Sequence, residues 1–145
     1  MLVETKRVNK SISDFLGADK TIANIGIISP ENPMGVSTTE KENKERIKRF
    51  EKLLKNVHGR YQRVKGMYNQ LEHSYIIFNT TVDDMKWYGK LFQQQSFIFG
   101  IFTEENGKPI IDFSYYGRIS PDEEYEKEDE VKGFVKIVTN FNEKQ

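Results

Sequence analysis

The side chains best suited to chemistry lie beside apolar runs that are typical of buried strands. Glu72 and Ser74 lie at the start of one such run, and Gln94 comes just before another. A carboxylate can transfer protons, and a side-chain amide can recognise the polar edge of a ligand. The residues that we predict to form a ligand site are Asn32, Pro33, Asn43, Arg46, Glu72, Ser74 and Gln94.

Each polar type in this set has a distinct predicted role. Arg46 is expected to hold an anionic group, and the amides of Asn32, Asn43 and Gln94 to contact polar edges of the ligand. Glu72 is the only candidate general base in the set. The sequence leaves open whether the protein is an enzyme.

Metal and cofactor chemistry finds little support in the residue types. The chain has no cysteine, which excludes a thiolate metal site and a disulfide framework. Its two histidines, His58 and His73, have no partner at the spacing of metal ligands. We therefore expect no metal and no cofactor.

Composition narrows the class of partner. The 145 residues carry 22 basic and 22 acidic side chains, and a zero balance argues against nucleic acid as a partner. The charged amino terminus does not resemble a signal peptide, and no apolar run reaches the ~20 residues of a membrane span. We expect a cytoplasmic protein of bacterial or phage origin, with no membrane association.

Charge is nevertheless unevenly distributed along the chain. Residues 40–65 contain ten basic and four acidic side chains, whereas residues 122–130 contain seven acids and one lysine. Such runs usually form solvated surfaces. Two alternatives stay open: the acidic segment 122–130 screens the basic surface, or the basic helix 40–57 binds a protein partner.

Hydrophobic periodicity and turn residues predict alternating strands and helices. Residues 37–39 supply hydroxyl groups for a helix start, and Asn106-Gly107 is typical of a tight hairpin turn. The predicted order is strand 21–28, helix 40–57, strands 61–68 and 74–78, helix 80–93, and strands 96–102 and 109–116.

This order predicts an α+β, two-layer sandwich with a ferredoxin-like β-α-β-β-α-β arrangement and an added hairpin strand. The predicted domain covers residues 21–117. An N-terminal extension (1–20) precedes it, with a short helix near Phe15. An acidic linker (118–132) and a C-terminal strand or tail (133–145) follow it.

The split arrangement also predicts which chain segments meet. Neighbouring strands are antiparallel, so the end of strand 21–28 lies beside the hairpin that joins the next two strands. The start of helix 40–57 and residues 93–95 belong to the same end of the sheet. We therefore expect the candidate site residues to converge there, near free helix N–H groups that suit anions.

At these residues the chain resembles a family of uncharacterised bacterial proteins, a domain of unknown function. Its signature runs T-A-x-N-P, E-N, Gly, E-x-S and Q-x-A. The first four motifs are matched by Asn32-Pro33, Glu42-Asn43, Gly66 and Glu72-His73-Ser74. Within the first motif, Ser29-Pro30 departs from the T-A pair. Gln94-Gln95-Ser96 resembles the last motif with serine in place of alanine. The resemblance covers about residues 24–102 and implies no activity.

Three functions remain open from the sequence. The first is a domain that binds a small ligand, anionic or nucleotide-like, at the polar end of the sheet. The second is a phage or host accessory protein that acts through protein–protein interaction. The third is an RNA-binding module that uses aromatic side chains of the sheet, namely Tyr75, Phe97, Phe99 and Tyr115.

Overall fold

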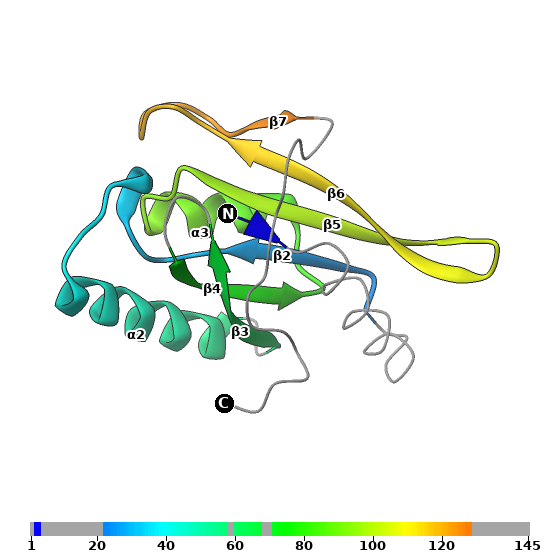
Figure 1. Cartoon of the computed structure of the whole chain (residues 1–145), viewed down its shortest axis with the longest axis horizontal. Helices are drawn as coiled ribbons and strands as arrows, with labels where there is room; N and C mark the ends of the chain where they lie inside the picture. Colours follow the sequence, from blue (N-terminus) through cyan, green and yellow to red (C-terminus); the bar gives the residue numbers. More distant parts are fainter. Residues whose placement is uncertain (1, 4–21, 58–59, 68–70, 129–145) are drawn as a thin grey trace.

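The predicted α+β class is confirmed in a computed structural model, which describes residues 2–3, 22–57, 60–67 and 71–128. Two helices lie on one face of an antiparallel sheet (Figure 1). The elements are β1 (Leu2–Val3), β2 (Asn24–Ile28), the 3-10 turn η1 (Pro33–Gly35), α2 (Glu40–Val57), β3 (Tyr61–Met67), β4 (Leu71–Phe78), α3 (Val82–Leu91), β5 (Ser96–Glu105), β6 (Lys108–Gly117) and β7 (Glu126–Glu128).

The sheet has seven strands in the order β1-β3-β4-β2-β5-β6-β7. Its central part, β3-β4-β2-β5, has the strand order expected from the chain, with antiparallel neighbours throughout. As predicted, β6 returns from a hairpin at Asn106-Gly107 and covers β5. Both turn residues have positive φ, 53° and 76°, which is typical of a type I′ turn. The finer assignment to a ferredoxin-like fold stays a prediction.

The structure differs from the sequence prediction mainly at element ends. Strand β4 begins at Leu71 and not at the predicted residue 74, so Glu72 lies inside the strand. The start of this strand resembles a turn in the sequence because Glu72 and His73 are polar and only half-buried. Helix α2 is capped by Thr39, whose Oγ1 accepts a hydrogen bond from Glu42 N at 3.1 Å.

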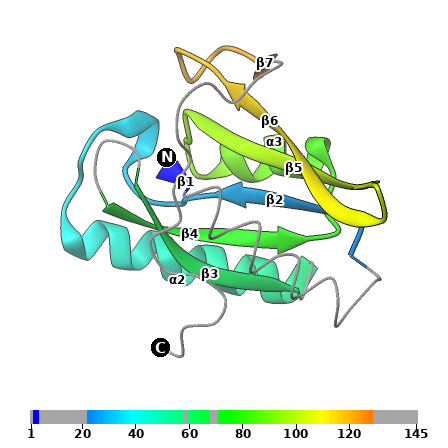
Figure 2. The ribbon, with the colours of Figure 1, turned by 45° about the vertical axis from the view of Figure 1, so that its right-hand side comes forward.

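The two faces of the sheet carry separate apolar clusters. On the helix side, Phe50 and Leu54 of α2 and Met85 and Tyr88 of α3 pack against the sheet. Figure 2 shows both helices behind the strands. Three rings considered for RNA stacking, Tyr75, Phe97 and Phe99, belong to this buried cluster, so they are not available to bases. Tyr115 packs, partly buried, against the cluster of the other face.

Two sequence predictions lie outside the described residues. These are the short helix near Phe15 and the C-terminal strand or tail at 133–145. The domain boundaries stay a prediction. The described part of 118–132 packs on the fold, and its last residues form β7 beside β6.

Arg118 and Tyr125 attach this segment to the domain. Both side chains are buried, and the Arg118 guanidinium lies 4.6 Å from the centre of the Tyr125 ring. Arg118 Nε and the Tyr125 hydroxyl both donate to the backbone oxygen of Gln94. Glu124 forms an ion pair with Lys90 of α3 at 2.8 Å. This acidic residue therefore pairs with α3 and not with the basic helix α2.

We predict that Gly89→Ala weakens the fold through Tyr125. A Cβ at position 89 would lie 2.3 Å from the Tyr125 hydroxyl oxygen, so the ring and the segment carrying it must move. Overpacking of this kind lowers the free energy of unfolding by about 1–3 kcal/mol. Urea denaturation of both proteins measures the difference.

The matched comparison is the same change in a Tyr125→Leu background, where no ring blocks the added methyl group. The loss of unfolding free energy should be smaller in that background, because alanine stabilises a helix by about 1 kcal/mol relative to glycine. If Gly89→Ala stabilised the parent protein, Tyr125 would not pack against α3.

Candidate functional site

Four chain segments meet at one end of the sheet, as the sequence predicted. The loop after β2 lies against the start of α2, the start of β4, and the turn between α3 and β5. The backbone joins two of these segments directly, since Met34 N donates to Gln93 O at 2.7 Å. The strands thereby bring residues about 40 and 60 positions apart in the chain into contact.

Asn32 is the centre of the polar network. Its side chain donates from Nδ2 to Glu72 Oε2 at 2.9 Å, and its Oδ1 accepts from Asn43 Nδ2 and Thr38 N, each at 3.1 Å. Asn43 Oδ1 in turn accepts from Asn32 N at 3.0 Å. Three of the predicted site residues, Asn32, Asn43 and Glu72, thus form one hydrogen-bonded group.

The backbone of this region is unusual as well as polar. Asn32, Met34 and Gln93 have φ of 49°, 53° and 51°, the left-handed region that non-glycine residues rarely occupy. Such conformations persist where the surrounding contacts hold them, and they gather at binding and catalytic sites. Here the hydrogen bonds of Asn32 and the Met34–Gln93 backbone bond hold them in place.

Glu72 is the carboxylate of the network with an altered acidity. Burial raises the pKa of Glu72, and the nearby Glu31 carboxylate raises it further, whereas the hydrogen bond from Asn32 opposes the shift. Only Oε2 takes a hydrogen bond from the described residues. The other carboxylate oxygen, Oε1, accepts no hydrogen bond from these residues.

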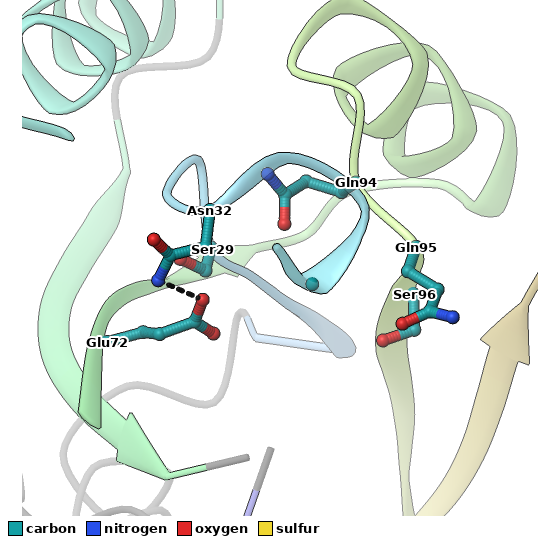
Figure 3. A pocket seen from close by; sticks show the side chains of 7 residues that line it. Ser29, Asn32, Glu72, Gln94, Gln95 and Ser96 are labelled. Atoms are coloured by element: carbon teal, nitrogen blue, oxygen red, sulfur yellow. Dashed lines mark hydrogen bonds between the residues drawn. The ribbon is translucent and has the colours of Figure 1, made fainter. Parts of the chain in front are cut away.

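A small cavity opens beside Glu72 and Asn32, with Gln95 and Ser96 on its other side (Figure 3). Its volume is about 20 Å³, enough for a water molecule or one functional group of a ligand. The lining residues are Ser29, Asn32, Gly35, Glu72, Gln94, Gln95 and Ser96.

Arg46 is buried and bonded to the protein. Its Nε donates to Pro30 O at 2.6 Å, and its Nη2 donates to Gln93 Oε1 at 2.8 Å and to Phe92 O. Nη1 lies 3.6 Å from the Glu42 carboxylate. These contacts occupy the donors that an anionic ligand would need, so Arg46 supports the loops around the site.

Gln94 also supports the loops, whereas Ser74 and Pro33 do not line the cavity. Gln94 Nε2 donates to Glu31 O at 2.9 Å and to Phe92 O at 3.0 Å. The buried Ser74 hydroxyl has no hydrogen-bond partner in the part of the chain that the structure describes. Pro33 begins the η1 turn.

Sequence reasoning missed Glu31, a second carboxylate in this network. Glu31 is 7% exposed, and its Oε1 accepts a hydrogen bond from His73 N and lies 3.3 Å from His73 Nδ1. Its position between two prolines resembles an ordinary loop. The neighbouring Asn32 was the only local signal.

Within the described ranges, no group of three His, Cys, Asp or Glu side chains is arranged to hold a metal ion. The helices there include none that is long and apolar enough to cross a membrane.

The fold and the site define an α+β domain with a polar network at one end of its sheet. Residues 28–97 match a family described as a protein of unknown function (DUF3293). The predicted resemblance to an uncharacterised family is confirmed, and every residue that lines the cavity lies within the matched span. No curated protein and no solved structure matches the chain.

Proposed function

We propose that this domain binds a small polar ligand at the end of the sheet, with Glu72 as the residue that anchors it. The observation that carries the proposal is the partly buried carboxylate beside a cavity, with one oxygen unused by the described residues. A titratable group with a shifted pKa in a concave site is a good candidate for a functional residue.

The chemistry of the lining favours a ligand group that donates hydrogen bonds. Glu72 and the adjacent Glu31 contribute negative charge, and the guanidinium of Arg46 is already bonded to backbone oxygens. Among the described residues, an anionic group would meet the carboxylates of Glu72 and Glu31, and the guanidinium of Arg46 is not available to it. An amino group suits this site, whether it belongs to an aliphatic amine or to the base of a nucleotide.

The size of the cavity limits how much of the ligand enters it. A volume of about 20 Å³ accommodates one amino group, and the rest of the ligand must lie outside, over Gln95 and Ser96. The carboxylate then replaces the hydration that the amino group loses. A charge-assisted hydrogen bond of this kind contributes about 1.5–3 kcal/mol.

The test is a thermal-shift screen of two sets of compounds, aliphatic diamines and amino-bearing nucleosides, followed by calorimetric titration of any hit. We expect one set to raise the melting temperature and Glu72→Gln to weaken binding about tenfold to a hundredfold. Glu123→Gln, at an exposed position, is the matched control and should leave the affinity unchanged. If neither set binds, or if Glu72→Gln binds equally well, the proposal fails.

The pH dependence gives a second readout. Because burial raises the pKa of Glu72, the side chain keeps its proton to a higher pH than an ordinary glutamate. Affinity for a cationic amine should therefore rise as the pH increases through that pKa, and Glu72→Gln should abolish the rise. The stability of the ligand-free protein should change in the opposite direction to the affinity. The contribution of Glu72 to folding stability is full at low pH and is lost as the pH rises through its pKa.

A further inference from the structure

A second concave region lies between α2 and the strands β3 and β4, separate from the cavity at Glu72. It has a volume of about 670 Å³, within the range of small-molecule sites. The helix contributes Lys44, Ile47, Lys48, Glu51, Lys52 and Lys55, and the strands contribute Arg63 and His73. We call this region the lysine groove.

The lysines form a regular row along the helix. Lys44, Lys48 and Lys52 are spaced by four residues, so their Cα atoms rise about 6 Å from one to the next, and Lys55 continues the row. All four side chains are exposed. Charged side chains of either sign keep the exposed face of a helix solvated, whereas the four side chains of this row are all positively charged.

The single acid in the groove is neutralised within the protein. Glu51 Oε2 accepts hydrogen bonds from Arg63 Nη1 at 2.9 Å and from the Tyr75 hydroxyl at 2.6 Å. Lys44 lies 3.3 Å from Glu40, an exposed pair that contributes little. Lys48, Lys52 and Lys55 have no acidic partner among the described residues. The groove therefore presents at least three positive charges without an ion-pair partner in the described part of the chain.

From this charge and volume we infer that the lysine groove binds a compact polyphosphate group, such as the triphosphate of a small phosphorylated molecule. Lysine provides point charges suited to phosphate oxygens. None of the described lining residues is aromatic, so the groove lacks the stacking surface of a single-stranded nucleic-acid site. His73 joins the groove to the Glu31 side of the polar network.

The test uses inorganic triphosphate as the probe, titrated calorimetrically at low ionic strength. We expect saturable binding that weakens as salt is added. The double variant Lys48→Glu with Lys52→Glu should weaken binding at least about tenfold, and the neutral variant Lys48→Gln with Lys52→Gln should weaken it less. All these side chains are exposed, so the variants should fold, as circular dichroism can verify.

The control is Lys86→Glu with Lys127→Glu, which changes the net charge equally but lies on α3 and β7. This variant should bind triphosphate like the parent. If the control lost as much affinity for triphosphate as Lys48→Glu with Lys52→Glu, the effect would be one of overall charge and the inference would be overturned. Tighter binding of a hexaglutamate peptide or of an oligonucleotide than of triphosphate would also overturn it. Because Glu72→Gln leaves the groove intact, the two proposals can fail independently.

Discussion

Arg46→Ala is expected to lower the free energy of unfolding by about 3 kcal/mol or more, from lost hydrogen bonds and a new cavity. The side chain is 5% exposed and donates to Pro30 O, Phe92 O and Gln93 Oε1. Alanine would remove the Arg46 donor from the buried Pro30 O, leave Phe92 O with Gln94 Nε2 as its remaining side-chain donor, and create a cavity beside Phe92. A domain of this size is stable by about 5–15 kcal/mol, so the loss should be visible in urea denaturation.

Arg49→Ala is the matched control for this prediction. Arg49 lies on the same helix, near the same Glu42 carboxylate and above the same Phe92 ring, at 5.9 Å compared with 6.0 Å for Arg46. Its side chain is 59% exposed. The change should lower stability by less than about 1 kcal/mol. Similar losses in the two variants would contradict the structural role assigned to Arg46.

The sequence did not indicate that Arg46 is buried, and the reason is physical. Helix α2 is rich in charge, and an arginine in such a helix usually faces solvent. Its position is set by carbonyl groups from distant turns, which no local pattern reveals. A spacing of four residues from Phe50, a core residue, was the only indication that Arg46 lies on the buried face.

Strand order was easier to predict than the site itself. Apolar runs, turn residues and helix starts are local signals, and antiparallel pairing then determines which ends of the elements meet. This reasoning correctly brought Asn32, Asn43 and Glu72 together. It could not show that the Asn32 and Asn43 side chains bond to groups of the protein itself, or that the space left beside Glu72 is small.

The lysine groove and the Tyr125 contact depend on tertiary placement in the same way. Residues 40–57 are visibly basic, but a groove exists only because Arg63 and His73 of the adjacent strands form its other side. Tyr125 lies among acidic residues that resemble a linker. Its ring is nevertheless buried beside Phe97, with 5.1 Å between ring centres.

Asn32→Ala should have the second large effect, a loss of about 3 kcal/mol or more in unfolding free energy. The alanine side chain cannot bond to Glu72 Oε2, Asn43 Nδ2 or Thr38 N, and each group left unsatisfied at these partly buried positions costs about 1–3 kcal/mol. At a φ of 49°, alanine also adds about 1–2 kcal/mol of backbone strain. Chemical denaturation measures the total.

Two further variants separate these contributions. Asn32→Gly tolerates the left-handed backbone, so its loss should reflect mainly the missing hydrogen bonds and be about 1 kcal/mol smaller than that of Asn32→Ala. Asn32→Asp keeps the shape but places a second carboxylate 2.9 Å from Glu72 Oε2.

The two acids of Asn32→Asp would raise each other's pKa in the folded state, so stability should be low at neutral pH and recover as the pH falls. If the deficit of Asn32→Asp did not shrink on acidification, Asn32 would not bond to Glu72. The network would then lack the contact that positions the proposed ligand anchor.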